Sequence, residues 1–237
     1  MKSGCRKKFP AAVGRKLKML SLFSKEGILG LLISIPGLLL ALSMHEFAHG
    51  YVAYLMGDST AKYSGRLSLN PLHHLDPVGA ICMLLFRFGW AKPVPINPQN
   101  FRNHRKGIVL VSLAGPFANF ILGFISCIIY YALVCFAPME NLFVYFISQV
   151  FLYSVYMNVG FMIFNLVPIP PLDGSKILME FLPPRIKYQI YRYERYFGII
   201  LIIAVYAGAI TPVLGIFRGW VLSLFDFVCQ AIFGMFI

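Results

Sequence analysis

The residues His45-Glu46-Phe47-Ala48-His49 place two imidazoles four positions apart, next to a carboxylate. Side chains at positions i and i+4 of a helix lie on one face, so both imidazoles can converge on one metal ion. Glu46 neighbours the first histidine, and its carboxylate can reach a metal-bound water without ligating the metal itself. The spacing therefore predicts one zinc ion per chain, ligated by His45 and His49, with Glu46 as the general base that activates a zinc-bound water.

A catalytic zinc needs a third protein ligand and keeps its fourth position for water. The candidate is Asp173, which directly follows the proline-rich stretch NLVPIPPL at 165–172. Prolines do not sustain a helix, and unwound backbone at membrane depth is tolerated only where it lines a cavity inside the protein. A competing interpretation makes Asp173 the N-cap of a helix that begins near Ser175. We favour the ligand because the two histidines otherwise lack a third partner.

Asn119 is a polar residue within an uncharged run, in the stretch AGPFAN at 114–119. A buried amide must find hydrogen-bond partners. It could donate to a developing oxyanion or to the backbone of an extended substrate, or it could tie two helices together. The sequence does not separate these roles. Asn165 is interpreted as a brace for the proline-rich turn.

Apolar runs must carry these residues, and five of them follow one another along the chain. About twenty apolar residues span a bilayer as a helix, so the first four runs are predicted to cross the membrane, whereas full crossing by the fifth is left open. A shorter run, Pro77–Trp90, is predicted to be a re-entrant or extended piece. The expected fold is an all-α polytopic membrane bundle of about five transmembrane helices, with a proline-broken helix at the metal site. The five runs are Gly27–Met56, Ile108–Ala137, Leu142–Pro171, Phe197–Phe217 and Gly219–Ile237.

The composition agrees with this class of protein. Apolar residues make up 59% of the chain and charged residues 13%, and the mean hydropathy is +0.74. These values exclude a soluble globular enzyme, a disordered chain and a disulfide-rich secreted scaffold. We expect one transmembrane domain over 27–237, preceded by a basic and partly amphipathic arm over 1–26 that lies on the membrane surface.

The positive charge lies in the segments between the apolar runs. The net charge is +12, from 21 Lys and Arg against 9 Asp and Glu. Segments 57–107 and 172–196 are basic, whereas the turn 137–142 has no Lys or Arg, which places the two long segments on the cytoplasmic side. We therefore expect contact with lipid head groups and no nucleic-acid partner. The side of the membrane on which the N-terminal arm lies is left open.

The pair HEFAHG (45–50) and NLVPIPPLDG (165–174) resembles the site-2 protease family of intramembrane zinc metalloproteases. The stretches at 57–80, 89–103 and 114–120 resemble the compact bacterial branch of that family, which lacks a PDZ domain. The resemblance implies zinc ligands at His45, His49 and Asp173, a catalytic Glu46, and a substrate contact by Asn119. It also implies a water-accessible active site below the membrane surface, reached from the cytoplasmic side.

The resulting hypothesis is a zinc endopeptidase that cuts transmembrane or membrane-proximal segments of other membrane proteins. A substrate helix must unwind before its carbonyls become accessible, and we expect it to pair with an extended edge in the 63–100 region. The rival hypothesis is a metal-binding membrane transporter or scaffold. Transporters usually carry paired broken helices, and this chain has one proline-rich break near its polar site. The sequence does not name the physiological substrate, the oligomeric state or an accessory regulator, although it leaves room for one.

Overall fold

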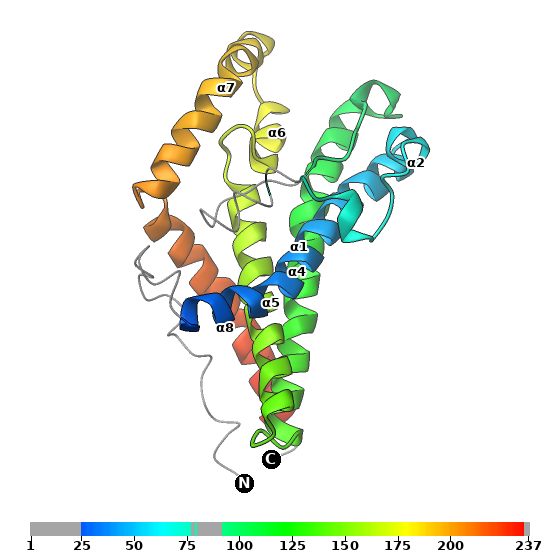
Figure 1. The fold of residues 1–237 in the computed structure, drawn as a ribbon. Helices are drawn as coiled ribbons and strands as arrows, with labels where there is room; N and C mark the ends of the chain where they lie inside the picture. The colour runs from blue at the N-terminus through cyan, green and yellow to red at the C-terminus, as the bar shows by residue number, and fades with distance from the viewer. Residues whose placement is uncertain (1–24, 77–78, 80–91, 235–237) are drawn as a thin grey trace. The chain divides into compact units, whose positions relative to one another are not determined.

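The computed structural model describes residues 25–76, 79 and 92–234, and Figure 1 shows their order along the chain. These residues form helices and connecting segments without a β-strand, which confirms the all-α class. The predicted N-terminal arm, up to residue 24, and the predicted re-entrant piece Pro77–Trp90, apart from Gly79, lie outside the described residues. The helices are α1 Lys25–Leu55, α2 Thr60–Tyr63, η3 Pro71–His73, η4 Pro98–Asn100, α4 His104–Phe136, α5 Leu142–Leu166, α6 Asp173–Met179, α7 Pro184–Tyr206 and α8 Thr211–Phe233.

Four stretches of helix in the described chain are long and apolar enough to cross a membrane, compared with the expected number of about five. The first three correspond to the first three predicted runs. They are Leu32–Leu55, His104–Phe136, Leu142–Leu166 and Thr211–Gly234.

The predicted span Phe197–Phe217 is wrong, because the chain turns between α7 and α8. Gly208 adopts φ +73°, a left-handed conformation that ends a helix and that side chains disfavour. The last third of this predicted span, from Thr211 on, therefore belongs to α8, which joins it to the last apolar run in one helix long enough to cross a membrane. Apolar residues continue on both sides of this turn, so composition alone does not predict it. The residue that marks the turn is Gly208.

The described chain forms two compact units built from different parts of the same helices. One comprises residues 25–39, 120–160 and 215–234, and the other comprises 40–119 and 161–214, apart from the undescribed positions. Each is considered by itself. The expectation of a single domain over 27–237 stays a prediction.

Small and polar residues form the helix contacts of the first unit. A Cβ on Gly37 of α1 would lie 2.7 Å from the Cα of Ser154 of α5, so these helices touch at their backbones. Ser154 Oγ lies 3.0 Å from Ser126 Oγ of α4, and the Tyr131 hydroxyl donates to Asp226 of α8. Since lipid tails are as apolar as the helices, close packing and polar contacts of this kind stabilise the bundle.

The second unit packs the end of α1 against residues 94–111. Its buried core is formed by Ala53, Phe101 and Val111, with partly buried apolar neighbours around them. Met56, directly after α1, accepts a hydrogen bond of 2.9 Å from Arg102 N in the segment before α4. This packing fixes the segment before α4 beside the half of α1 that carries His45 and His49. The neighbours are Val52, Met56, Ile96 and Ile108.

Candidate active site

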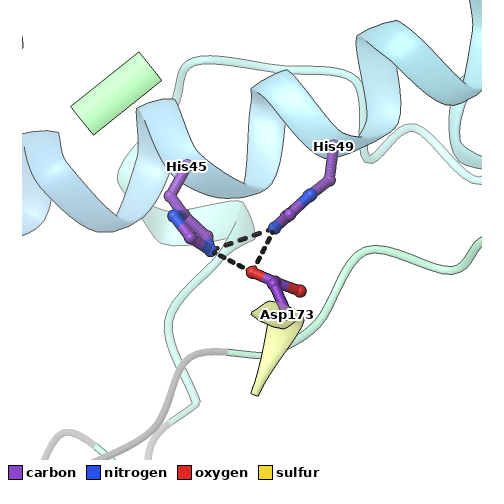
Figure 2. A group of neighbouring side chains, drawn as sticks. All are labelled: His45, His49 and Asp173. Atoms are coloured by element: carbon purple, nitrogen blue, oxygen red, sulfur yellow. Dashed lines mark hydrogen bonds and ion pairs between the residues drawn. The ribbon is translucent and has the colours of Figure 1, made fainter. Parts of the chain in front are cut away.

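His45, His49 and Asp173 converge within the second unit. The two histidines leave the same face of α1, and Asp173 is the first residue of α6; Figure 2 shows its carboxylate pointing at both imidazoles. Asp173 Oδ2 lies 3.2 Å from His45 Nε2 and 3.1 Å from His49 Nε2, and the two Nε2 atoms are 3.0 Å apart. All three side chains are buried. The structure thus brings together the three residues that the sequence predicts as metal ligands.

The hydrogen bonds behind the imidazoles determine which nitrogen carries the proton. His49 Nδ1 lies 2.7 Å from the carbonyl oxygen of Val111, which can only accept, so Nδ1 is the protonated nitrogen. His45 Nδ1 lies 2.7 Å from Asn119 Oδ1. The other end of that amide donates to Ala41 O at 3.0 Å, which orients its oxygen toward His45. Both Nε2 atoms therefore present lone pairs toward Asp173.

This donor set fits a divalent metal ion. Two imidazole lone pairs and a carboxylate oxygen face one another at 3.0–3.2 Å, and in these tautomers none of the three atoms carries a hydrogen that could form a hydrogen bond between them. Such a cluster of acceptors is repulsive unless a cation lies among them. Ligand atoms around a tetrahedral zinc ion are separated by about 3.3 Å, given zinc–ligand distances of about 2.0–2.1 Å. The observed separations match that value closely.

Gly115 of α4 makes room for both imidazoles. A Cβ at this position would lie 2.5 Å from His49 Nε2 and 2.6 Å from His45 Cε1. No side chain larger than hydrogen fits there without moving a ring. Sequence reasoning missed this requirement, because it follows from how α4 packs against α1.

The proline-rich break delivers Asp173 to the two histidines. Helix α5 ends at Leu166 and α6 begins at Asp173, as the prolines predict. The turn is tight, since a Cβ on Gly174 would lie 2.2 Å from Leu166 O. The N-cap position of α6 is held by Leu172, so the capping role considered for Asp173 is not observed. Its second oxygen accepts from Lys176 Nζ at 2.9 Å.

Glu46 lies beside the histidines and contacts residues 92–97, a segment without helix or turn that we call the strap. Its Oε2 accepts a hydrogen bond of 2.9 Å from the backbone N–H of Val94. The start of the strap is held by the Arg66 guanidinium, which donates to Lys92 O at 2.6 Å and to Pro93 O at 3.2 Å. The strap thus passes directly over the candidate general base.

A cavity of about 500 Å³ opens beside these groups. Its walls include Glu46, His45, His49 and Asp173 on one side and strap residues on the other. Apolar side chains contribute to the lining, namely Phe101, Ile108 and Val111, and so do Ser112, Asn165, Pro171 and Lys176. Its volume lies within the usual range of about 300–1,000 Å³ for ligand sites.

Asp58, which follows the end of α1, anchors the far end of the strap. Its carboxylate has 0% of its surface exposed and accepts from Asn97 N at 2.7 Å and from Asn100 Nδ2 at 2.8 Å. Burial raises the pKa of Asp58, but hydrogen bonds from Thr60, Asn100 and the backbone of Asn97 outweigh it and hold that pKa below its ordinary value. No feature of the sequence singles out Asp58, because an aspartate after a glycine is common where a helix ends.

Asn119 lies against His45, fully buried, with its oxygen toward that imidazole and its nitrogen toward Ala41 O. The bond to Ala41 O ties α4 to α1, one of the roles considered from the sequence, whereas the contact with His45 is not predicted there. A substrate contact by Asn119 stays a prediction. Asn165 Nδ2 donates to Phe161 O at 3.0 Å in the last turn of α5, next to the proline-rich turn.

Comparison with known proteins decides the family. Residues 140–205, which include Asp173, match the model of peptidase family M50. The chain is 39% identical over 199 residues to "Putative zinc metalloprotease YwhC" of Bacillus subtilis (strain 168), an alignment that covers 81% of this chain and 90% of that protein. This chain belongs to peptidase family M50.

Two further relatives of this M50 chain are named "Putative zinc metalloprotease Rip2". The protein from Mycolicibacterium smegmatis (strain ATCC 700084 / mc(2)155) is 31% identical over 159 residues, covering 65% of this chain and 58% of that protein. The protein from Mycobacterium tuberculosis (strain ATCC 25618 / H37Rv) is 28% identical over 198 residues, covering 81% and 72%. No solved structure matches the chain. M50 membership confirms the resemblance to site-2 proteases and identifies a membrane zinc metalloprotease.

Proposed function

We propose that this M50 protein is an intramembrane zinc endopeptidase that hydrolyses peptide bonds in transmembrane or membrane-proximal segments of other membrane proteins. The observation that carries the proposal is the convergence of His45, His49 and Asp173 on one point, with the Glu46 carboxylate in the wall of the same cavity. Membership of family M50 and four membrane-length apolar helices support it. In this proposal His45, His49 and Asp173 hold one zinc ion per chain.

The residues have distinct roles in hydrolysis. Zinc, when bound, polarises the scissile carbonyl and makes a water more acidic. Glu46 accepts a proton from the attacking water as its oxygen bonds to the carbonyl carbon, and it returns the proton to the amine as the carbon–nitrogen bond breaks. The Val94 N–H holds Glu46 Oε2 and leaves Oε1 for this proton transfer. The Nδ1 partners of both histidines leave their Nε2 lone pairs available to hold the zinc ion.

The substrate backbone would pair with the strap. In an extended chain, alternate residues direct their N–H and C=O groups to the same side, so Val94 and Ile96 face the same way. The Val94 N–H reaches Glu46, whereas the Val94 C=O and the Ile96 N–H have no hydrogen-bond partner within the described part of the chain. An unwound substrate segment can therefore add to this edge and place its carbonyls beside the metal ligands.

The active site is proposed to open toward the cytoplasm, where soluble products leave. The segment that follows the histidine-bearing half of α1 carries Lys62, Arg66, Lys92 and Arg102, and positive charge marks cytoplasmic segments. The partners in this proposal are membrane-protein substrates within the lipid bilayer, together with an accessory regulator that controls their access.

Replacing Glu46 by Gln tests the mechanism. The carboxamide keeps the size of the side chain but cannot accept the proton, so cleavage of a reconstituted single-span substrate should fall by at least about 100-fold. The zinc content should stay at one ion per chain, because Glu46 is not a ligand. Glu194→Gln on α7 is the matched control and should cleave like the parent protein.

Two outcomes would contradict the proposal. Cleavage by the Glu46→Gln variant at the parental rate would refute the general-base role. Zinc flux into liposomes, with no chelator-sensitive cleavage by the parent protein, would support the transporter or scaffold instead.

A further inference from the structure

Asp58 connects the helix that carries the histidines to the strap that would pair with substrate. We propose that Asp58 is a positioning residue that sets the register of the strap relative to His45, His49 and Asp173, and so selects which substrate bond is cut. This inference rests on the proposed function. Asp58 is not among the residues that line the cavity, so it acts through the strap and not on the substrate.

The contacts of Asp58 fully occupy its carboxylate. Oδ1 accepts from Thr60 N at 3.1 Å, from the Thr60 hydroxyl and from Asn100 Nδ2, whereas Oδ2 accepts from Asn97 N. Thr60 belongs to the segment directly after α1, and Asn97 and Asn100 belong to the end of the strap and to η4. The carboxylate is therefore a buried clamp between two segments far apart in the sequence. Hydrogen bonds to a charged acceptor are about twice as strong as neutral ones.

The strap can transmit this clamp to the active site. Asn97, held by Asp58, lies three residues after Val94, held by Glu46, a distance of about 10 Å along an extended chain. Pro93 and Pro95 flank Val94, and each proline ring fixes its own φ angle. A displacement of Asn97 would therefore also displace Val94 and Ile96, because few backbone angles between them are free to compensate for it.

A displaced strap would change the bond that is cut. The metal ligands lie on α1 and α6, whereas the pairing groups lie on the strap, so the scissile position depends on the offset between them. One residue of an extended chain spans about 3.3 Å, and even a misplacement of about 1 Å can cost up to about 100-fold in rate. Loosening the clamp should reduce cleavage and spread it over neighbouring peptide bonds.

Replacing Asp58 by Asn tests the clamp directly. The amide nitrogen cannot accept, so the backbone N–H of either Thr60 or Asn97 loses its acceptor in each orientation of the side chain. Asn100→Asp attacks the same contact from the other side, since it places two carboxylates together. Both variants should cut a reconstituted single-span substrate at bonds beside the parental one, at a total rate at least about 10-fold lower, with unchanged zinc content. Mass spectrometry of both products locates each cut.

The double variant Asp58→Asn with Asn100→Asp provides the control. An amide at 58 can donate to a carboxylate at 100 and still accept from Asn97 N, whereas Thr60 N stays without its acceptor. The two bonds that hold the strap are thus restored, so the cut should return toward the parental bond. A purely structural role for Asp58 would change the thermal unfolding midpoint but not the position of the cut. Should Asp58→Asn fail to fold, Asn100→Ala gives the same test with a smaller shift, because it removes the 2.8 Å bond to Asp58 and a longer one of 3.5 Å to Thr60 Oγ1 but leaves the bond from Asn97 N in place.

The outcomes separate this inference from the function on which it rests. Active variants that cut only at the parental bond would overturn the role of Asp58 and leave the protease intact. Absence of cleavage by the parent protein itself would instead refute the proposed function.

Discussion

Asn119 Oδ1 lies 2.7 Å from Nδ1 of His45, on the edge of the ring opposite to the Nε2 that faces Asp173. The amide is fully buried and its nitrogen is bonded to Ala41 O, so the oxygen cannot turn away without breaking both contacts. A partner on the second nitrogen of a ligating histidine fixes its tautomer and its orientation. We therefore expect Asn119 to raise the affinity for the metal ion through His45, whether or not it also contacts the substrate.

Asn119→Ala should weaken zinc binding by about 10–100-fold, because the Nδ1–H of His45 loses its acceptor and the ring is free to rotate. Competition with a chelator of known affinity measures the change. Asn158→Ala is the control, since it removes an equally buried amide that bonds Ser154 in the other unit. An unchanged zinc affinity together with a raised KM would show that Asn119 serves the substrate alone.

Gly115→Ala should abolish stoichiometric zinc binding. The added Cβ would lie 2.5 Å from His49 Nε2, so one ring must leave the position that faces Asp173. Zinc content after purification and dialysis measures the effect. Gly160→Ala, in a membrane helix where a Cβ meets nothing within 4 Å, should bind one zinc ion like the parent. Full zinc content in the Gly115 variant would mean that α4 moves away at little cost.

Those parts of the site that depend on local rules could be predicted from the sequence. Helical spacing alone puts His45 and His49 on one face, and prolines alone end the helix before Asp173. Assigning Asp173 to the same site as the two histidines needs one further rule, namely that a catalytic zinc has three protein ligands, of which the histidines supply two. These rules involve residue type and spacing, so they do not depend on how helices pack.

The remaining parts depend on packing between distant segments. Gly115 and Asn119 matter because α4 lies against the imidazoles. The sequence marks Asn119 as a polar residue within an uncharged run but does not identify His45 as its partner, and it does not distinguish Gly115 from the other small residues of that run. Asp58 accepts from the backbone N–H of Asn97, and Glu46 accepts from the backbone N–H of Val94. Nearly every residue has a backbone N–H, so residue type does not predict these contacts. The turn at Gly208 is local, but apolar residues continue on both sides of it, so the composition predicts one continuous helix there.

Removing zinc should destabilise the protein. Without a cation, the two Nε2 lone pairs and Asp173 Oδ2, which lie 3.0–3.2 Å apart, repel one another until the site takes up a proton. Zinc at 100 times its dissociation constant should stabilise the folded state by about 2.7 kcal/mol, provided that the unfolded chain does not bind it. The thermal unfolding midpoint in detergent, with chelator and after zinc is restored, measures this difference.

Two variants should differ in how strongly zinc raises their thermal unfolding midpoint. Asp173→Ala should unfold at nearly the same temperature with and without zinc, because two imidazoles alone hold the ion weakly. Glu46→Gln should respond to zinc like the parent, because its carboxylate is not a ligand. A strong zinc response in the Asp173 variant would place the third ligand elsewhere.

The clamp at Asp58 should make stability depend on acid pH. Its pKa lies below the ordinary value of 3.8 in the folded protein, so the folded state binds this proton less readily than the unfolded chain does. The contribution of Asp58 to stability is therefore complete above about pH 4 and is lost as the pH falls through the folded-state pKa. Thermal unfolding midpoints recorded from pH 7 to pH 3 should fall more steeply for the parent than for Asp58→Asn.

The comparison isolates one carboxylate, because every other titrating group, including the zinc ligands, is the same in both proteins. Glu194→Gln should run parallel to the parent, since this side chain accepts no comparable set of buried hydrogen bonds among the described residues. If the Asp58 carboxylate were instead held unfavourably, its pKa would be raised and the parent would gain stability relative to the variant on acidification. The sign of the difference between the two curves therefore decides whether the clamp stabilises the charged form.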